Sequence, residues 1–191
     1  KFILDIHSSL NEVSGTGGTK RIVSKEGNHG AKHLSRICRI YPQTKFIVLI
    51  RDPRDIYASL KAIAKKKREG VRSPTFNLDV SPCKYIHHNK SKNIYSYNNL
   101  SAQYGKDPNY CFVRYEDLVE HPSIEMRKVA AFLDIPFTDA LVTPSNLGNP
   151  WQGNASSLMV FDGIAVNRIG KWEKELEVQE RRIIEYFLQG Y

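Results

Sequence analysis

The sequence predicts an α/β domain of three layers with a mainly parallel central sheet. Three observations support this prediction. Short apolar runs alternate along the chain with segments of helical periodicity. The apolar runs are continuous, which is typical of strands covered on both faces. Two of the runs are followed by charged residues and then by a proline that opens a helical pattern. We expect residues 1–191 to form a single domain.

The expected elements follow from these patterns in chain order. Continuous apolar or β-branched runs predict strands, and apolar residues that recur once per helical turn predict helices. The strands are expected at Phe2–Ile6, Arg21–Ser24, Lys45–Ile50 and Tyr110–Tyr115, and the helices at Ala31–Tyr41, Pro53–Arg68, Lys92–Tyr104, Pro122–Leu133 and Glu175–Gln189. Two segments rich in turn-forming residues, Gly70–Lys90 and Thr138–Ile169, are expected to be irregular.

Composition places the chain among ordinary globular proteins, with 41% hydrophobic and 25% charged residues. The formal net charge of +8 favours a polyanionic partner, a membrane surface or a phosphate-bearing small molecule. The cysteines do not form a disulfide framework: we expect Cys38 and Cys111 to be core thiols and Cys83 to be free in a loop. No spacing of ligands indicates a metal site, and His87 and His88 are interpreted as loop residues.

The first functional signal is a charged segment at the end of a predicted strand. The strand Lys45–Ile50 is followed by the letters RDPRD, and the proline among them fits the first turn of a helix. Ligands of α/β sheets bind at the carboxyl ends of strands, and a helix N-terminus attracts anions. Arg51 offers a fork of donors for phosphate oxygens, and Ser59 offers a hydroxyl. We interpret this junction as a phosphate site rather than a solvated loop.

A second junction has the same architecture. The letters CFVRYEDLVEHP, residues 111–122, combine a strand, an expected charged turn at Glu116 and Asp117, and a proline that opens a helix. The pairing of RDPRDxxxS with RYEDL resembles the sulfotransferases that use 3′-phosphoadenosine 5′-phosphosulfate (PAPS), most closely their carbohydrate and bacterial members. FLDIPF, residues 132–137, and NRIGKWEKEL, residues 167–176, resemble that family's helix end and its C-terminal glycine–tryptophan segment.

The resemblance implies a P-loop-type α/β fold and PAPS as co-substrate. It implies that Arg51 and Ser59 bind the 3′-phosphate and that Tyr115 stacks beside or packs near the adenine. Gly170 and Lys171 are implied to lie in a late loop that closes over the 3′-phosphate. We therefore expect an enzyme that moves a sulfuryl group from PAPS to a hydroxyl acceptor, with a glycan as the expected acceptor.

The chain departs from the family pattern at two places. Ala165–Asn167 stands where the cytosolic branch carries an Arg-Lys-Gly triplet, which argues against that steroid and phenol branch. SGTGGTK, at Ser14–Lys20, is followed by a strand-like segment instead of a helix, so we do not interpret it as the loop that holds the phosphosulfate. We therefore expect the chain to be N-terminally incomplete and inactive alone. The resemblance also implies a nucleotide contact at Asn154–Ser157.

The catalytic candidates lie in SKEGNH, at the end of a predicted strand. Sulfuryl transfer needs a base for the acceptor hydroxyl and a cation for the charge that develops on the leaving group. The segment matches the family region that carries catalytic residues. Lys25 is the candidate cation, and His29 or Glu26 is the candidate base. No metal is required.

Two other functions remain open at this point. A basic α/β module would bind RNA or another phosphate-rich ligand without catalysis, and a P-loop nucleotide kinase would need a Walker lysine loop, which the chain lacks. For the sulfotransferase we expect no nucleic-acid partner. A eukaryotic member would carry a membrane anchor upstream of Lys1 and lie in the Golgi lumen, which sequons at Asn89, Asn99 and Asn154 favour; a bacterial member would be cytoplasmic.

Overall fold

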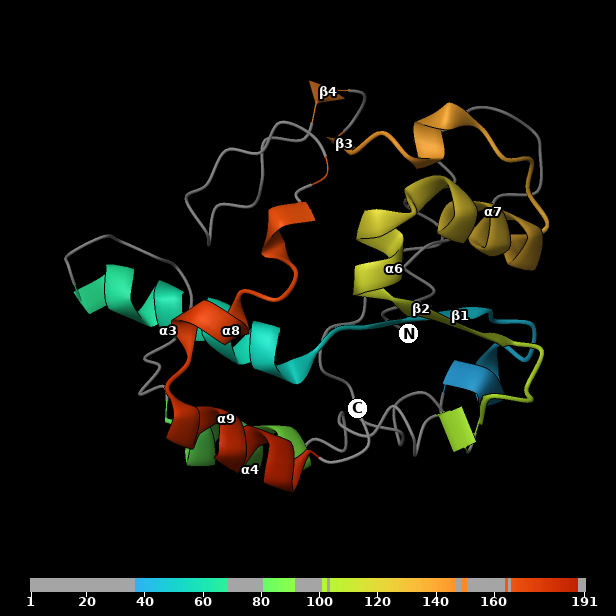
Figure 1. Ribbon diagram of the computed structural model, residues 1–191. Coiled ribbons are helices and arrows are strands. Elements are labelled where there is room, and N and C mark those ends of the chain that lie inside the picture. The colour runs from blue at the N-terminus through green and yellow to red at the C-terminus, as the bar shows by residue number, and fades with distance from the viewer. Residues whose placement is uncertain are drawn as a thin grey trace.

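The computed structural model describes residues 37–68, 81–91, 101–102, 104–146, 149–150, 164 and 166–188 (Figure 1). Its elements are β1 (Phe46–Ile50), α3 (Pro53–Arg68), α4 (Pro82–Ser91), β2 (Tyr110–Arg114), α6 (Tyr115–Glu120), α7 (Pro122–Leu133), the 3₁₀ turn η1 (Asp139–Leu141), β3 (Ser145–Asn146), β4 (Asn149–Pro150), the 3₁₀ turn η2 (Val166–Arg168), α8 (Trp172–Glu175) and α9 (Val178–Phe187). The α/β class is thereby confirmed.

The two long strands form a small parallel sheet at the centre of the molecule (Figure 1). The register pairs Phe46 with Tyr110 and Ile50 with Arg114, so the strands end at the same level. We expected a strand covered on both faces, but Ile47 is 47% exposed. Leu49, which points to the same face, is 57% exposed. Helix α7 packs on β2, so it leaves this row of β1 uncovered among the described residues.

Helices α6 and α7 lie above the sheet in Figure 1 and contact β2. We expected Glu116 and Asp117 to form a charged turn, but they lie in α6, which begins directly after β2. Helix α7 has the expected bounds, with Pro122 in its first turn. It ends at Leu133. The next residue, Asp134, has a left-handed φ of 56°, which lets the backbone N–H of Ile135 return to the carbonyl of Ala130.

The principal core lies between α3, α4 and α9. Tyr57 of α3 is fully buried, and its ring packs 5.3 Å from the ring of Tyr85. The Tyr85 hydroxyl donates a 2.9 Å hydrogen bond to the carbonyl of Pro53. The remaining buried members of this core are Ala58, Ile86, Leu176 and Ile184. The first two turns of α3 are therefore anchored by helices from the later part of the chain.

Helix α4 corrects the expectation of an irregular segment at Gly70–Lys90. Residues 69–80 lie outside the described residues, but Pro82–Ser91 is helical. His87 and His88, interpreted from the sequence as loop residues, therefore lie in a helix. Tyr85 and Ile86 are the residues of α4 buried in the core. Because so little of the helix is apolar, its sequence carries no clear periodic stripe, and contacts with α9 stabilise it.

The C-terminal helix expected from residue 175 is interrupted at Leu176. This residue is extended, with φ −103° and ψ 137°, and its side chain is buried. Helix α9 begins after it with a reciprocal cap between Glu177 and Glu180. Glu180 also accepts hydrogen bonds from Lys61 Nζ at 2.7 Å and from the Tyr57 hydroxyl at 3.1 Å. Burial raises the pKa of Glu180, but these donors outweigh it and hold the pKa below its usual value.

Several expected elements lie wholly or partly outside the described residues. The strands expected at Phe2–Ile6 and Arg21–Ser24 are among them. Within two other expected helices, residues 37–40, 101–102 and 104 are helical. Residues 145–146 and 149–150 of the region expected to be irregular form the short antiparallel pair β3–β4.

The expectation for the cysteines is met only in part. Cys38 and Cys111 are half-buried rather than fully buried. Cys83 is exposed and free as expected, but it lies in helix α4 and not in a loop. Burial raises the pKa of the Cys111 thiol. The Cys38 sulfur lies 4.0 Å from the Tyr110 hydroxyl. These thiols lie on a strand and a helix away from the RDPRD segment, so they do not contribute to the candidate site.

Candidate active site

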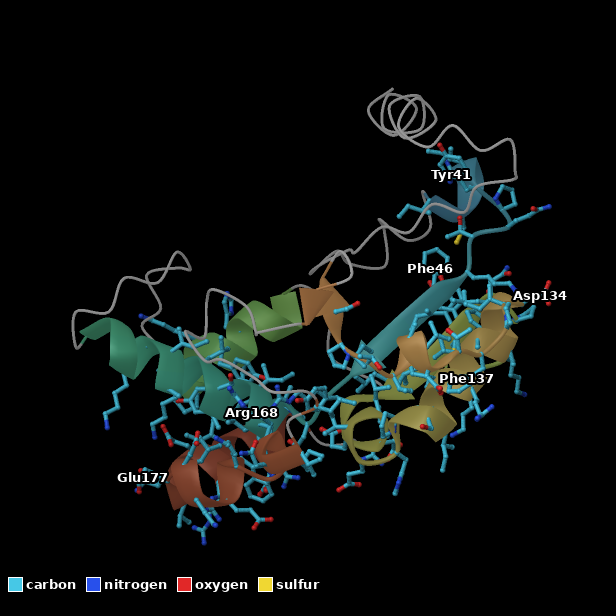
Figure 2. All side chains as sticks on the ribbon, turned by 90° about the horizontal axis from the view of Figure 1, so that it is seen from above. Tyr41, Phe46, Asp134, Phe137, Arg168 and Glu177 are labelled. Carbon is cyan, nitrogen blue, oxygen red and sulfur yellow. The ribbon has the colours of Figure 1, made fainter. Side chains whose placement is uncertain are left out.

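The candidate site lies where the two parallel strands end. Because Ile50 pairs with Arg114, the next residues, Arg51 and Tyr115, follow at neighbouring strand ends. Figure 2 shows Phe46 at the beginning of β1 and Arg168 beyond the opposite end of that strand. The β1–α3 junction, the β2–α6 junction and the segment around Arg168 therefore meet at the edge of the sheet where α/β folds bind ligands.

Arg51 is held in place by one ring and one carbonyl. Its guanidinium lies over the Tyr115 ring, 4.3 Å from the centroid. One of its terminal nitrogens donates a 3.2 Å hydrogen bond to the backbone carbonyl of Arg168. Its Nε is buried and has no hydrogen-bond acceptor among the described residues. Arg51 also has no carboxylate partner there, so its charge remains available for an anion.

Arg54, in contrast, is neutralised by its neighbours. Its guanidinium hydrogen-bonds the Asp52 carboxylate, at 2.7 Å for the shortest contact, and Glu185 of α9 at 2.9 Å. The same group stacks on the Trp172 ring, 3.8 Å from the centroid. The hydrogen bond to Asp52 raises the pKa of Arg54, although burial acts in the opposite direction. Arg54 therefore binds the C-terminal segment and is a poor candidate for an external phosphate.

Asp52 builds the turn between β1 and α3. Its carboxylate accepts the backbone N–H of Arg54 at 2.8 Å, and its carbonyl accepts the N–H of Ile56 at 3.1 Å, as a helix N-cap does. Its own backbone N–H donates to Glu116 of α6 at 2.9 Å. Asp52, Arg54 and Glu116 are therefore structural partners of one another, and the turn that they form is not a solvated loop.

The segment Gly170–Trp172 docks on the first turn of α3. The buried carboxylate of Asp55 accepts the backbone N–H of Gly170 at 2.8 Å and that of Trp172 at 3.0 Å. Gly170 has a left-handed φ of 71°, and open space surrounds the point where a Cβ would lie. Between the two, Lys171 is half-exposed, with Nζ 3.9 Å from Glu175.

The structure brings most of the expected nucleotide residues to one region. Arg51 contacts Tyr115 directly, and Gly170 is joined to α3 through Asp55. Ser59 follows Asp55 by one helical turn, so the two side chains share a face of α3. Lys25, Glu26 and His29 lie outside the described residues, as does Asn154–Ser157. The three catalytic candidates therefore remain predictions from the sequence.

Sequence reasoning missed the partners that organise this region. Asp55 and Glu116 belong to the two charged motifs, yet the motifs alone predict no contact of either residue with another segment. The hydrogen bonds that define their roles join residues far apart in the sequence. Asp55 and Gly170, for example, are 115 positions apart. The signal that could have identified Asp55 is its place in the first turn of a helix, where a carboxylate commonly accepts backbone N–H groups.

Comparison with known proteins identifies the family. Residues 4–139 match the model of the "Sulfotransferase family", so the chain belongs to that family, and the expectation of an enzyme class is confirmed at this level. The chain is 27% identical over 144 residues to the "Protein-tyrosine sulfotransferase" of Drosophila melanogaster, covering 72% of this chain and 27% of that protein. It is 27% identical over 159 residues to "Protein-tyrosine sulfotransferase 1" of Danio rerio, covering 79% of this chain and 41% of that protein. The chain thus spans less than half the length of these two relatives.

A solved structure supports the fold. The "Sulfotransferase Domain from the Curacin Biosynthetic Pathway" superposes with a TM-score of 0.60 at 22% identity. The match covers 95% of this chain and 66% of that chain. At this identity the likeness bears on the fold alone. The two relatives from Drosophila melanogaster and Danio rerio are named for tyrosine in proteins, and neither is named for a glycan.

Two further properties of the described residues bear on the site. None of their helices combines the length and the apolar character needed to cross a membrane. The same residues contain no group of three or more His, Cys, Asp or Glu side chains arranged to hold a metal ion.

Proposed function

We propose that this chain carries the nucleotide-binding part of a sulfotransferase that uses PAPS, within one domain over residues 1–191 of a three-layer P-loop-type fold. The observation that carries the proposal is Arg51. It lies at a strand end, it is oriented by a ring and a carbonyl, and no carboxylate among the described residues neutralises it. A guanidinium in that state favours a phosphate with several oxygens. The 3′-phosphate that distinguishes PAPS from 5′-AMP is such a group.

The surrounding residues fit a phosphate. The Asp52 carboxylate is paired with Arg54 and the Asp55 carboxylate accepts backbone N–H groups, so neither of them occupies the Arg51 guanidinium. We propose that Ser59 donates its hydroxyl and that Lys171 contributes its ammonium. Because the N–H of Gly170 is already bonded to Asp55, its contribution is the open space beside it. Tyr115 contributes by orienting Arg51.

Lys25 and His29 are the proposed catalytic residues. In the transfer, the acceptor oxygen forms a bond to sulfur while the bond from sulfur to the bridging phosphate oxygen breaks. The acceptor proton passes to His29, or to Glu26 in its place, and Lys25 stabilises the charge that develops on the bridging oxygen. The products are a sulfate ester and 3′,5′-bisphosphoadenosine. This assignment rests on the position of these residues in the sequence.

We further propose that the acceptor is the phenolic hydroxyl of tyrosine in a protein. The relatives named above support this acceptor, whereas the glycan expected from the sequence has no support among them. A tyrosine phenol has a pKa near 10, so it needs less help from a base than a sugar hydroxyl does. The two acceptors make different demands on His29, and they can be compared directly.

The test is transfer of labelled sulfate from PAPS by the full-length protein to three acceptors. These are a tyrosine peptide, the same peptide with phenylalanine, and an oligosaccharide. We expect label on the tyrosine peptide alone, and label on the oligosaccharide alone would replace the proposed acceptor.

Arg51→Ala should lower the affinity for PAPS by about 2 kcal/mol, because it removes a charge-assisted contact. Arg127→Ala is the matched control. Arg127 lies on α7, away from the proposed site, and its guanidinium stacks 3.9 Å from the centroid of the Phe137 ring, so the affinity for PAPS should not change. Absence of transfer to every acceptor would overturn the proposal.

A further inference from the structure

Asp55 is a buried carboxylate close to a site for which we propose an anionic ligand. Its side chain belongs to a residue only 2% exposed. It forms no ion pair with any residue that the structure describes, and both of its oxygens accept backbone N–H groups. Burying a charge is costly unless hydrogen bonds satisfy it. Here two peptide N–H groups supply them, so the ion is stable without Arg51, which remains free for another anion.

The two N–H groups belong to residues on either side of Lys171. Oδ2 of Asp55 accepts the N–H of Gly170, and Oδ1 accepts the N–H of Trp172. One carboxylate therefore fixes the backbone on both sides of the lysine. Gly170 adopts a φ of 71° in this turn, a conformation that other residues rarely adopt. The direction in which Lys171 leaves the backbone is set by these two bonds.

The same segment is attached a second time, to the residue at the end of β1. The carbonyl of Arg168 accepts a hydrogen bond from Arg51 at 3.2 Å. Residues 168–172 are thus bonded to residues 51–55 at Arg168 and again at Gly170 and Trp172. Displacing the turn from Asp55 would move the acceptor that orients Arg51 and would release Lys171 at the same time.

We propose that Asp55 is a positioning residue for recognition of the 3′-phosphate, an inference that rests on the proposed function of Arg51, Gly170 and Lys171. Asp55 does not touch the nucleotide, since it is buried and its oxygens are occupied. It holds the Gly170–Trp172 turn against α3, so that Arg51 and Lys171 converge on one phosphate. A negative residue therefore promotes the binding of a negative group.

The test is the affinity of the full-length protein for 3′,5′-bisphosphoadenosine and for 5′-AMP, measured by calorimetry before and after Asp55→Asn. Asparagine has the same shape but only one acceptor oxygen, and its amide would face one of the two N–H groups. We expect Asp55→Asn to lower the affinity for 3′,5′-bisphosphoadenosine by about tenfold and to leave the affinity for 5′-AMP unchanged. If Asp55 had only a structural role, Asp55→Asn would lower the affinity for both nucleotides or for neither.

Two further variants make the result specific. Glu185→Ala breaks the contact of α9 with Arg54 in the same interface but leaves the turn bonded to Asp55, so the preference for the 3′-phosphate should persist. Asp55→Glu keeps the negative charge but shifts both oxygens by one methylene group relative to the N–H groups of Gly170 and Trp172, and it should reproduce the loss. It also answers the question if Asp55→Asn does not fold.

The outcomes are distinct. If the unchanged protein binds the two nucleotides equally, the proposed function fails, and the role of Asp55 fails with it. If the unchanged protein prefers the 3′-phosphorylated nucleotide and Asp55→Asn, or Asp55→Glu in its place, keeps that preference, the positioning role alone is overturned. Loss of the preference in Glu185→Ala as well would also overturn it, because general loosening of α9 would then suffice.

Discussion

Replacing Tyr115 with leucine tests whether this ring acts through Arg51 or on the nucleotide base. The sequence resemblance implies a ring that packs near adenine, whereas the structure places the ring under the Arg51 guanidinium at 4.3 Å. The two functions predict different losses of nucleotide affinity in Tyr115→Leu. A ring that orients Arg51 matters only for nucleotides that carry the 3′-phosphate, and a ring that supports adenine matters for every adenosine nucleotide.

The size of the effect follows from the environment of the pair. A cation–π contact contributes about 0.5–1 kcal/mol at exposed sites and about 2 kcal/mol when desolvated. Both residues are half-buried, and Nε of Arg51 is fully buried, so the pair lies between these limits. We take about 1 kcal/mol, which corresponds to about a fivefold change in affinity. Leucine keeps the apolar bulk and removes the ring face.

The assay is calorimetry of Tyr115→Leu and Tyr115→Phe with 3′,5′-bisphosphoadenosine and with 5′-AMP. We expect Tyr115→Leu to bind the 3′-phosphorylated nucleotide about fivefold more weakly and 5′-AMP unchanged. Tyr115→Phe keeps the ring, so it should behave like the unchanged protein. Equal weakening of both nucleotides by Tyr115→Leu would refute the reasoning and restore the adenine contact. A phenylalanine variant as weak as the leucine variant would show that the hydroxyl matters instead.

Three further predictions concern the stability of the C-terminal core and the catalytic candidates. The pKa of Glu180 is lowered in the folded protein, so its stabilising effect is present at neutral pH and is lost as the pH falls through that lowered pKa. In Glu180→Gln, the free energy of unfolding measured with urea should therefore fall less between about pH 7 and pH 3. Ile184→Ala removes a fully buried side chain and should cost about 3 kcal/mol in urea unfolding, whereas Val178→Ala on the exposed face of α9 should cost less than about 0.5 kcal/mol. Lys25→Ala and His29→Ala should lower kcat far more than the affinity for PAPS, and unchanged kcat in both would remove SKEGNH from the site.

The elements that the sequence predicted best are those whose signals are local. The bounds of α3 and α7 match the expectation because each begins at a proline and carries apolar residues at helical spacing. The strands β1 and β2 are each one residue shorter than expected, because Lys45 lies before β1 and Tyr115 lies after β2. Patterns within one element suffice in these cases, since the residues that decide the structure are near neighbours.

The elements that the sequence did not predict depend on partners far along the chain. Helix α4 is stabilised by the burial of Tyr85 and Ile86 against other helices, which no periodic stripe within residues 82–91 announces. The break at Leu176 exists because that side chain enters the core. Uncovered Leu49 shows the opposite case: a continuous apolar run indicates a strand but does not reveal how many faces are covered.

The site illustrates the same limit in terms of charge. The letters RDPRD contain two positive and two negative residues, so the segment is formally neutral and its sequence does not say which end attracts an anion. The structure separates the charges by their partners. Asp52 is paired with Arg54, and Asp55 is compensated by the N–H groups of Gly170 and Trp172. Because neutral peptide groups satisfy Asp55 without occupying an arginine, Arg51 at the end of β1 has no carboxylate partner among the described residues. A neutral motif thereby presents a cation at the edge of the sheet, and this follows only once the contacts of the C-terminal segment are known.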